Sequence, residues 1–155
     1  MQLIILLFVI IYPLYILVRS IKHRASSEAI NINSNSKIEI GMNFEDVNNI
    51  IDRKNIFEES EMGNGYKWIR AWISPFDIRI RAAFCFNSDK LESIEIYPYS
   101  TEISKPKTWE DACDENMENE YKFCKKWYSK HKKYFPRSAE VFKDYKNWSA
   151  GIIIR

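Results

Sequence analysis

Cysteine is scarce in this sequence, and the few cysteines form no motif. The 155 residues contain three cysteines, an odd number, and none stands in a Cys-x-x-Cys pair. Such a set argues against a disulfide framework, gives no support to a structural zinc site and favours a reducing compartment. The first cysteine is Cys85, so no N-terminal cysteine is available for a bacterial lipoprotein anchor.

The sequence also has little glycine and no excess of charge of one sign. It has four glycines and a net charge of +2, with basic residues interspersed among acidic ones, which argues against nucleic-acid binding. No D-x-D-x-D-G calcium loop is present, and no metal or cofactor is predicted. The chain is 46% hydrophobic and 15% aromatic, which is enough to fold one small domain around a core.

The longest hydrophobic run lies at the N-terminus, where every residue from Leu3 to Val18 is apolar, aromatic, or proline. At about 1.5 Å per residue the run is just long enough to cross a bilayer. It predicts a transmembrane anchor over residues 1–21 and a polar juxtamembrane tether over residues 22–36. The alternative is a cleaved signal peptide, which would begin with positive charge and end at a small-residue cleavage site.

Three basic residues follow this run: Arg19, Lys22 and Arg24. They are predicted to contact lipid headgroups at the membrane boundary. Because positively charged flanks stay inside, they predict a single-pass protein of the cell membrane whose domain is cytoplasmic.

Residues 37–155 are predicted to form an α+β domain: an antiparallel sheet of about four to five strands packed on one long and one short helix. Asn43 is expected to cap the short helix, with Asp46 completing a capping-box variant, and residues 52–66 are expected to be loop. The long helix is expected to end before Pro136. The predicted strands are 37–40, 67–73, 78–86, 91–97, 139–143 and 148–155, and the long helix is 108–134.

The three central strands form a predicted meander with two different faces. A four-residue first turn pairs Ile73 with Ile78, and alternation then gathers the apolar side chains on one core face. For Ile94 and Ile96 to join this face, the second loop must hold an odd number of residues. The predicted core face consists of Ile69, Ala71, Ile73, Ile78, Ile80, Ala82 and Phe84.

The opposite face of the meander combines tryptophan with arginine, which are residue types enriched in binding hot spots. The predicted protein-binding residues are Trp68, Arg70, Trp72, Arg79 and Arg81. The alternative is a plain solvated face on which Trp72 and Arg79 form a cation–π pair and Glu95 neutralises an arginine.

The long helix carries a predicted packing stripe but no predicted catalytic residue. Cys124 and His131 lie seven residues apart, about 10 Å along a helix axis, too far for a hydrogen-bonded dyad. The lysines from Lys122 onward fit a lipid contact or an ordinary solvent face. The stripe consists of Trp109, Cys113, Met117, Tyr121, Cys124, Tyr128 and His131.

The segment Ile38–Ile51, I-E-I-G-M-N-F-E-D-V-N-N-I-I, resembles the opening repeat of the SmpA/OmlA and β-lactamase-inhibitor-like proteins. The resemblance implies a strand, a Gly-Met turn and a capped helix that precede a sheet. The chain departs from these proteins in lacking the lipoprotein cysteine and in adding the long helix. Its general plan is also similar to small bacterial immunity and inhibitor proteins, which bind a toxin or enzyme through an exposed face.

Three functions are consistent with these patterns. The first is a non-enzymatic, membrane-tethered module that binds a protein partner, such as an immunity or inhibitor protein with a toxin or enzyme as its partner. The second is a structural accessory subunit of a membrane complex, in which residues 3–18 pack against other helices. The third is a small membrane-associated enzyme whose site draws on Asp77, Glu95 and His131.

Overall fold

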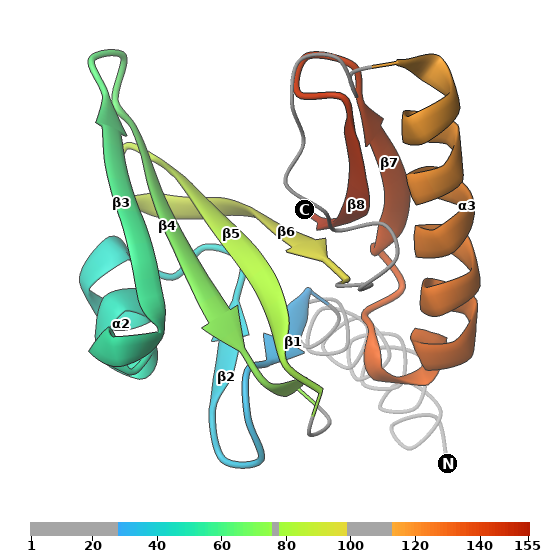
Figure 1. The fold of residues 1–155 in the computed structure, drawn as a ribbon. Helices are drawn as coiled ribbons and strands as arrows, with labels where there is room; N and C mark the ends of the chain where they lie inside the picture. The colour runs from blue at the N-terminus through green and yellow to red at the C-terminus, as the bar shows by residue number, and fades with distance from the viewer. Residues whose placement is uncertain (1–27, 76–77, 99–112) are drawn as a thin grey trace, which may run out of the picture.

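The computed structural model describes residues 28–75, 78–98 and 113–155. Most of them belong to a six-stranded antiparallel sheet with the strand order β3-β4-β5-β6-β8-β7, and a separate two-stranded hairpin, β1-β2, accompanies it (Figure 1). The strands of the large sheet are β3 (Ile56–Met62), β4 (Tyr66–Ile73), β5 (Ile80–Asn87), β6 (Lys90–Tyr97), β7 (Glu140–Asp144) and β8 (Ser149–Ile154).

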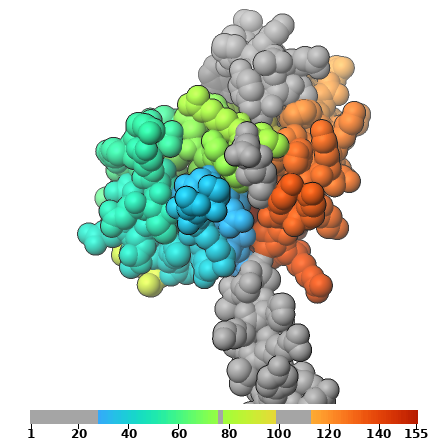
Figure 2. All heavy atoms as spheres, turned by 90° about the horizontal axis from the view of Figure 1, so that it is seen from below, coloured from blue at the N-terminus to red at the C-terminus, as the bar shows by residue number. Residues whose placement is uncertain are grey.

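The hairpin and the helices pack on one face of this sheet, which we call the core face. The hairpin pairs β1 (Ala29–Asn31) with β2 (Lys37–Glu39). In Figure 2 the hairpin, in blue, lies between α2 and β3, in cyan to green, and α3, in orange. Helix α2 spans Phe44–Ile50 and α3 spans Asp114–His131, followed by a short 3-10 helix, Lys132–Tyr134.

The core is a continuous cluster that joins all these elements. Ile30 and Ile38 of the hairpin, Val47 of α2 and Phe84 of β5 are each at most 1% exposed. Helix α3 adds Trp127, which packs against the same cluster. Burial of this apolar face supplies the main driving force for folding.

The predicted core face of the meander is confirmed, but its register differs by two residues. Ile73 pairs with Ile80 rather than with Ile78, because Ile78 still belongs to the connection, where its N–H donates to the carbonyl of Pro75 at 3.1 Å. An even shift leaves every side chain on its predicted side of the sheet. Ile69 and Phe84 are accordingly 0% exposed.

The loop between β5 and β6 holds two residues, so the predicted odd loop is wrong. Ser88 and Asp89 form it with φ values of 49° and 68°, and Asn87 pairs with Lys90, as in a tight hairpin turn. A bulge between the pairs Cys85–Ser93 and Phe86–Leu91 supplies the extra residue. This bulge, rather than the loop, puts Ile94 and Ile96 into the core.

The predicted fold class is wrong in its strand count, because two strands lie where loop and tether were expected. β3 occupies much of the predicted loop 52–66, and β1 lies within the predicted tether. β3 was not predicted as a strand because its side chains do not alternate between apolar and polar. β1 is only three residues long, and serine and asparagine surround it.

The short and the long helix match their predictions in part. The Asn43 side chain caps α2 by accepting a hydrogen bond from the backbone N–H of Asp46 at 2.8 Å, as predicted. In α3, Met117 and Cys124 are buried, whereas Cys113 is exposed and does not belong to the packing stripe. Residues 99–112, including the predicted first turn of the long helix, lie outside the described residues.

The prediction of a single-pass membrane protein with a cytoplasmic domain is corrected. In the part of the chain that the structure describes, neither α2 nor α3 combines the length and the hydropathy that a membrane span requires. The predicted anchor over residues 1–21 and its basic flank, Arg19, Lys22 and Arg24, lie outside the described residues.

Candidate functional site

Three of the predicted binding residues line the outer face of β4, the sheet face opposite the core. Trp68, Arg70 and Trp72 alternate along the strand with three buried residues, Ile69, Ala71 and Ile73. Each of the three is partly exposed. The period of two in the strand therefore separates an apolar side from an aromatic and cationic side.

Cations lie over both indole rings. The guanidinium carbon of Arg79 lies 4.7 Å from the ring centroid of Trp72, which is the cation–π pair predicted for a plain solvated face, and that of Arg70 lies 5.6 Å from the ring of Trp68. Arg70 also forms an ion pair with Glu58 of the neighbouring strand β3. Both indole rings therefore have a cation beside them on the outer face.

Strand β3 extends this surface with two exposed apolar side chains. Phe57 is 48% exposed and Met62 is 54% exposed, and the Phe57 ring lies 6.0 Å from that of Trp72. Phe57 stands at an irregularity between the pairs Ile56–Ala71 and Glu58–Arg70. We call Phe57, Met62, Trp68, Arg70, Trp72, Arg79 and Arg81 the outer-face cluster.

Arg81 joins the cluster to a polar group on β6. It pairs with Tyr97 across the strands, and its guanidinium carbon lies 6.0 Å from the tyrosine ring. The Tyr97 hydroxyl donates a hydrogen bond of 2.5 Å to Oε2 of Glu95. Among the described residues Glu95 forms no direct ion pair with an arginine, because Arg70 pairs with Glu58 instead. Arg70 and Arg155 act on Glu95 only through longer-range Coulomb interactions.

Burial raises the pKa of Glu95 above its ordinary value of 4.5, and the Tyr97 hydrogen bond opposes this shift only partly. Burial likewise raises the pKa of Tyr97, with the Glu95 carboxylate as the next cause. A carboxyl group with a raised pKa favours the protonated form in the folded state. The stability that protonated Glu95 contributes to the fold is fully present below the pKa of the unfolded state. It is lost as the pH rises through the pKa of the folded state.

Replacing Glu95 by glutamine should therefore flatten the pH dependence of stability. Glutamine keeps an acceptor for the Tyr97 hydroxyl but does not titrate, so the loss of stability that ionisation of Glu95 causes as the pH rises above about 4.5, the ordinary pKa of a glutamate, should disappear. Urea unfolding at a series of pH values from about 4 upward measures the pH dependence of the free energy of unfolding. Glu92→Gln, on the exposed bulge residue of the same strand, is the control. A Glu95→Gln profile identical to that of the wild type would contradict the account.

The residues proposed for catalysis do not come together. Glu95 lies on the outer face beside Tyr97, whereas His131 ends α3, a helix that packs on the core face through Trp127 and Tyr128. His131 is engaged with Trp127, whose ring lies 4.3 Å away and whose carbonyl lies 2.8 Å from Nδ1. Asp77 lies outside the described residues.

Cysteine chemistry and metal binding also find no support in the described residues. Burial raises the pKa of Cys85 to about 11, which disfavours the reactive thiolate. Within the described ranges no group of three histidine, cysteine or carboxylate residues is placed to hold a metal ion.

All five predicted binding residues lie on one face, beside two residues that the sequence did not single out. The sequence did not predict Phe57 and Met62 as binding residues because their strand, β3, was expected to be loop. Comparisons with protein-family models, with curated proteins and with solved structures find no match. The resemblance of residues 38–51 to the SmpA/OmlA and β-lactamase-inhibitor-like proteins stays a prediction.

Proposed function

We propose that this protein is a non-enzymatic binding module that holds a protein partner on its outer-face cluster. The observation that carries the proposal is the clustering of Trp68, Arg70 and Trp72 with the exposed side chains of Phe57 and Met62 on the sheet face away from the core. Tryptophan and arginine are enriched at the few positions that dominate binding energies. The described helices pack on the core face, so none of them covers these side chains.

The exposed rim of the cluster suits a protein better than a small molecule. Phe57 and Met62 are each about half exposed and lie along an edge strand rather than in an enclosed cavity. Small-molecule sites are concave and bury most of their ligand, whereas protein interfaces combine aromatic anchors with a polar rim. Immunity and inhibitor proteins bind a toxin or an enzyme in this way, and we propose that class for the chain.

Photo-crosslinking tests whether a protein occupies this face. Benzoylphenylalanine at Phe57 replaces an exposed aromatic residue of the cluster, and the same group at Tyr145, which is 65% exposed, serves as the matched control. Tyr145 follows β7, at the opposite edge of the sheet. In cells that produce the protein naturally, we expect a discrete crosslinked protein from position 57 only. No adduct, or equal adducts from both positions, would contradict the proposal.

A further inference from the structure

Arg79 and Arg81 are exposed arginines of the outer-face cluster whose charge no described carboxylate balances. Both side chains are exposed, and among the described residues neither forms an ion pair. Arg70, in contrast, is paired with Glu58. The cluster therefore presents two guanidinium groups that are available to an anion.

The immediate neighbours of these two arginines are aromatic. Arg81 stands between Trp72 of β4 and Tyr97 of β6, and Arg79 lies over the same Trp72 ring. Glu95 of β6 uses its carboxyl group to accept the hydrogen bond from the Tyr97 hydroxyl. A guanidinium that stacks on a ring keeps the N–H donors at its edge, so both arginines can bind an oxyanion and remain beside their rings.

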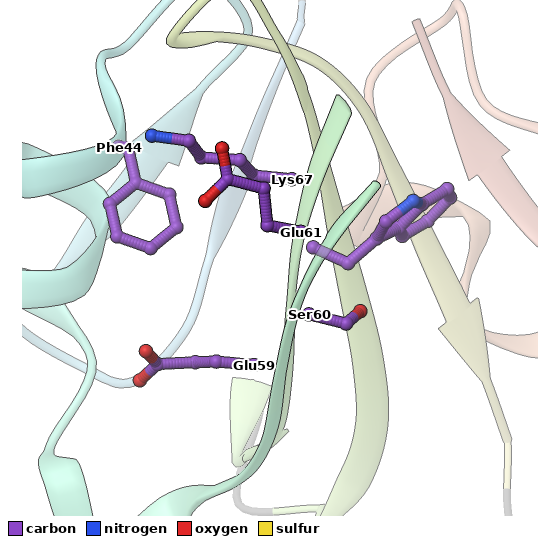
Figure 3. A pocket seen from close by; sticks show the side chains of 6 residues that line it. Phe44, Glu59, Ser60, Glu61 and Lys67 are labelled. Atoms are coloured by element: carbon purple, nitrogen blue, oxygen red, sulfur yellow. The ribbon is translucent and has the colours of Figure 1, made fainter. Parts of the chain in front are cut away.

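Two of the three glutamates of β3 point away from the outer face. Figure 3 shows Glu59 and Glu61 projecting toward Phe44, on the side of the strand opposite to Ser60. Ser60 pairs with Trp68, which belongs to the outer face. Because side chains alternate along a strand, Glu59 and Glu61 lie on the face of the sheet away from the two arginines.

The two arginines also have a defined spacing. Arg79 directly precedes β5 and Arg81 is the second residue of that strand, so at about 3.4 Å per residue their Cα atoms lie about 7 Å apart. Alternate side chains of an extended peptide have this same spacing and point to one side. Phe57, whose ring lies 6.0 Å from that of Trp72, adds apolar surface beside them. A protein segment with carboxylates at alternate positions matches this site in charge and in spacing.

A nucleic acid matches the site less well than an acidic protein segment. Proteins that bind nucleic acids make about six to ten phosphate contacts and line the path of the backbone with a cationic groove. The outer-face cluster has only two arginines without an ion pair among the described residues, and the adjoining edge strand β3 contains three glutamates and no basic residue.

We propose that the outer-face cluster binds an acidic segment of its protein partner, with one carboxylate on Arg79 and another on Arg81. The inference rests on the proposed function in that a protein occupies this face. It adds the chemistry of that partner: the aromatic side chains supply contact area, and the two arginines select carboxylates through hydrogen bonds assisted by charge.

A synthetic peptide tests the inference without the natural partner. The probe is an end-blocked peptide of about eight residues with alternating aspartate and valine, added to the full chain. We expect binding that shifts the NMR signals of the Trp72 indole N–H and of the Arg79 and Arg81 Nε–H groups, and that weakens as salt is added. A peptide of the same sequence with lysine in place of aspartate should not bind.

Arginine variants separate this site from a general effect of positive charge. Arg79→Gln together with Arg81→Gln should weaken the aspartate peptide by about tenfold, because two exposed ion pairs are lost. The matched control is Arg137→Gln, which removes an exposed arginine that precedes β7 at the opposite edge of the sheet and should leave the affinity unchanged. Unchanged affinity of the double variant, or equal weakening by the control, would overturn the inference.

The same assay distinguishes other occupants of the face. Tighter binding of a single-stranded oligothymidylate of about eight nucleotides, or of phosphatidylserine vesicles, than of the aspartate peptide would overturn the inference. Self-association of the chain that the double variant abolishes would also overturn it, because the occupant would then be a second copy.

The outcome is distinguishable from failure of the proposed function. Crosslinking of a protein from position 57 without binding of the aspartate peptide would overturn the acidic segment alone. Binding of the peptide without any crosslinked protein would contradict the proposed function alone.

Discussion

Replacing Phe84 by alanine is expected to lower the free energy of unfolding by about 3–5 kcal/mol. Phe84 is 0% exposed, and it pairs on β5 with Ile69 and Ile94, which are also fully buried. Removing the ring loses its transfer free energy and leaves a cavity that the paired strands cannot close. A domain of this size is stable by only about 5–15 kcal/mol, so one substitution should remove a large share.

Urea unfolding followed by circular dichroism measures this loss. Phe57→Ala is the matched control, because it deletes the same ring from a side chain that is 48% exposed and should cost less than about 1 kcal/mol. Similar losses at the two positions would contradict the assignment of core face and outer face.

The two faces of the central strands were predictable from the sequence because alternation survives errors in register. The predicted register of Ile73 differed from the observed one by two residues, yet each side chain lies on the face of the sheet that was predicted for it. Ile94 reached the core by a bulge instead of an odd loop, since either device changes the phase by one residue. The same alternation put Trp72 and Arg81 on the outer face.

Strands β1 and β3 could not be predicted in this way. β3 is exposed along almost its whole length, so neither of its faces carries the apolar period that marks a half-buried strand. β1 has a single fully buried side chain, Ile30. The part of the site that depends on β3, Phe57 with Met62, was therefore visible only in the structure.

Replacing Arg70 and Trp72 together by alanine is expected to abolish binding of the partner that crosslinks to position 57. Trp72 contacts Phe57 and Arg79, and Arg70 links Trp68 to Glu58, so the two changes remove the centre of the cluster. Truncation of one hot-spot residue costs about 2 kcal/mol or more, roughly 30-fold in affinity. Both side chains point away from the core, so the domain should stay folded.

The affinity of this double variant for the purified partner, measured by titration calorimetry, is the most direct test of the binding face. The matched control is Tyr145→Ala with Lys146→Ala, which deletes an exposed aromatic and a basic side chain near the opposite edge of the sheet. We predict wild-type affinity for the control and a loss of at least about 100-fold for a folded Arg70→Ala and Trp72→Ala variant. Unchanged affinity of that variant would show that the partner binds elsewhere and would contradict the account.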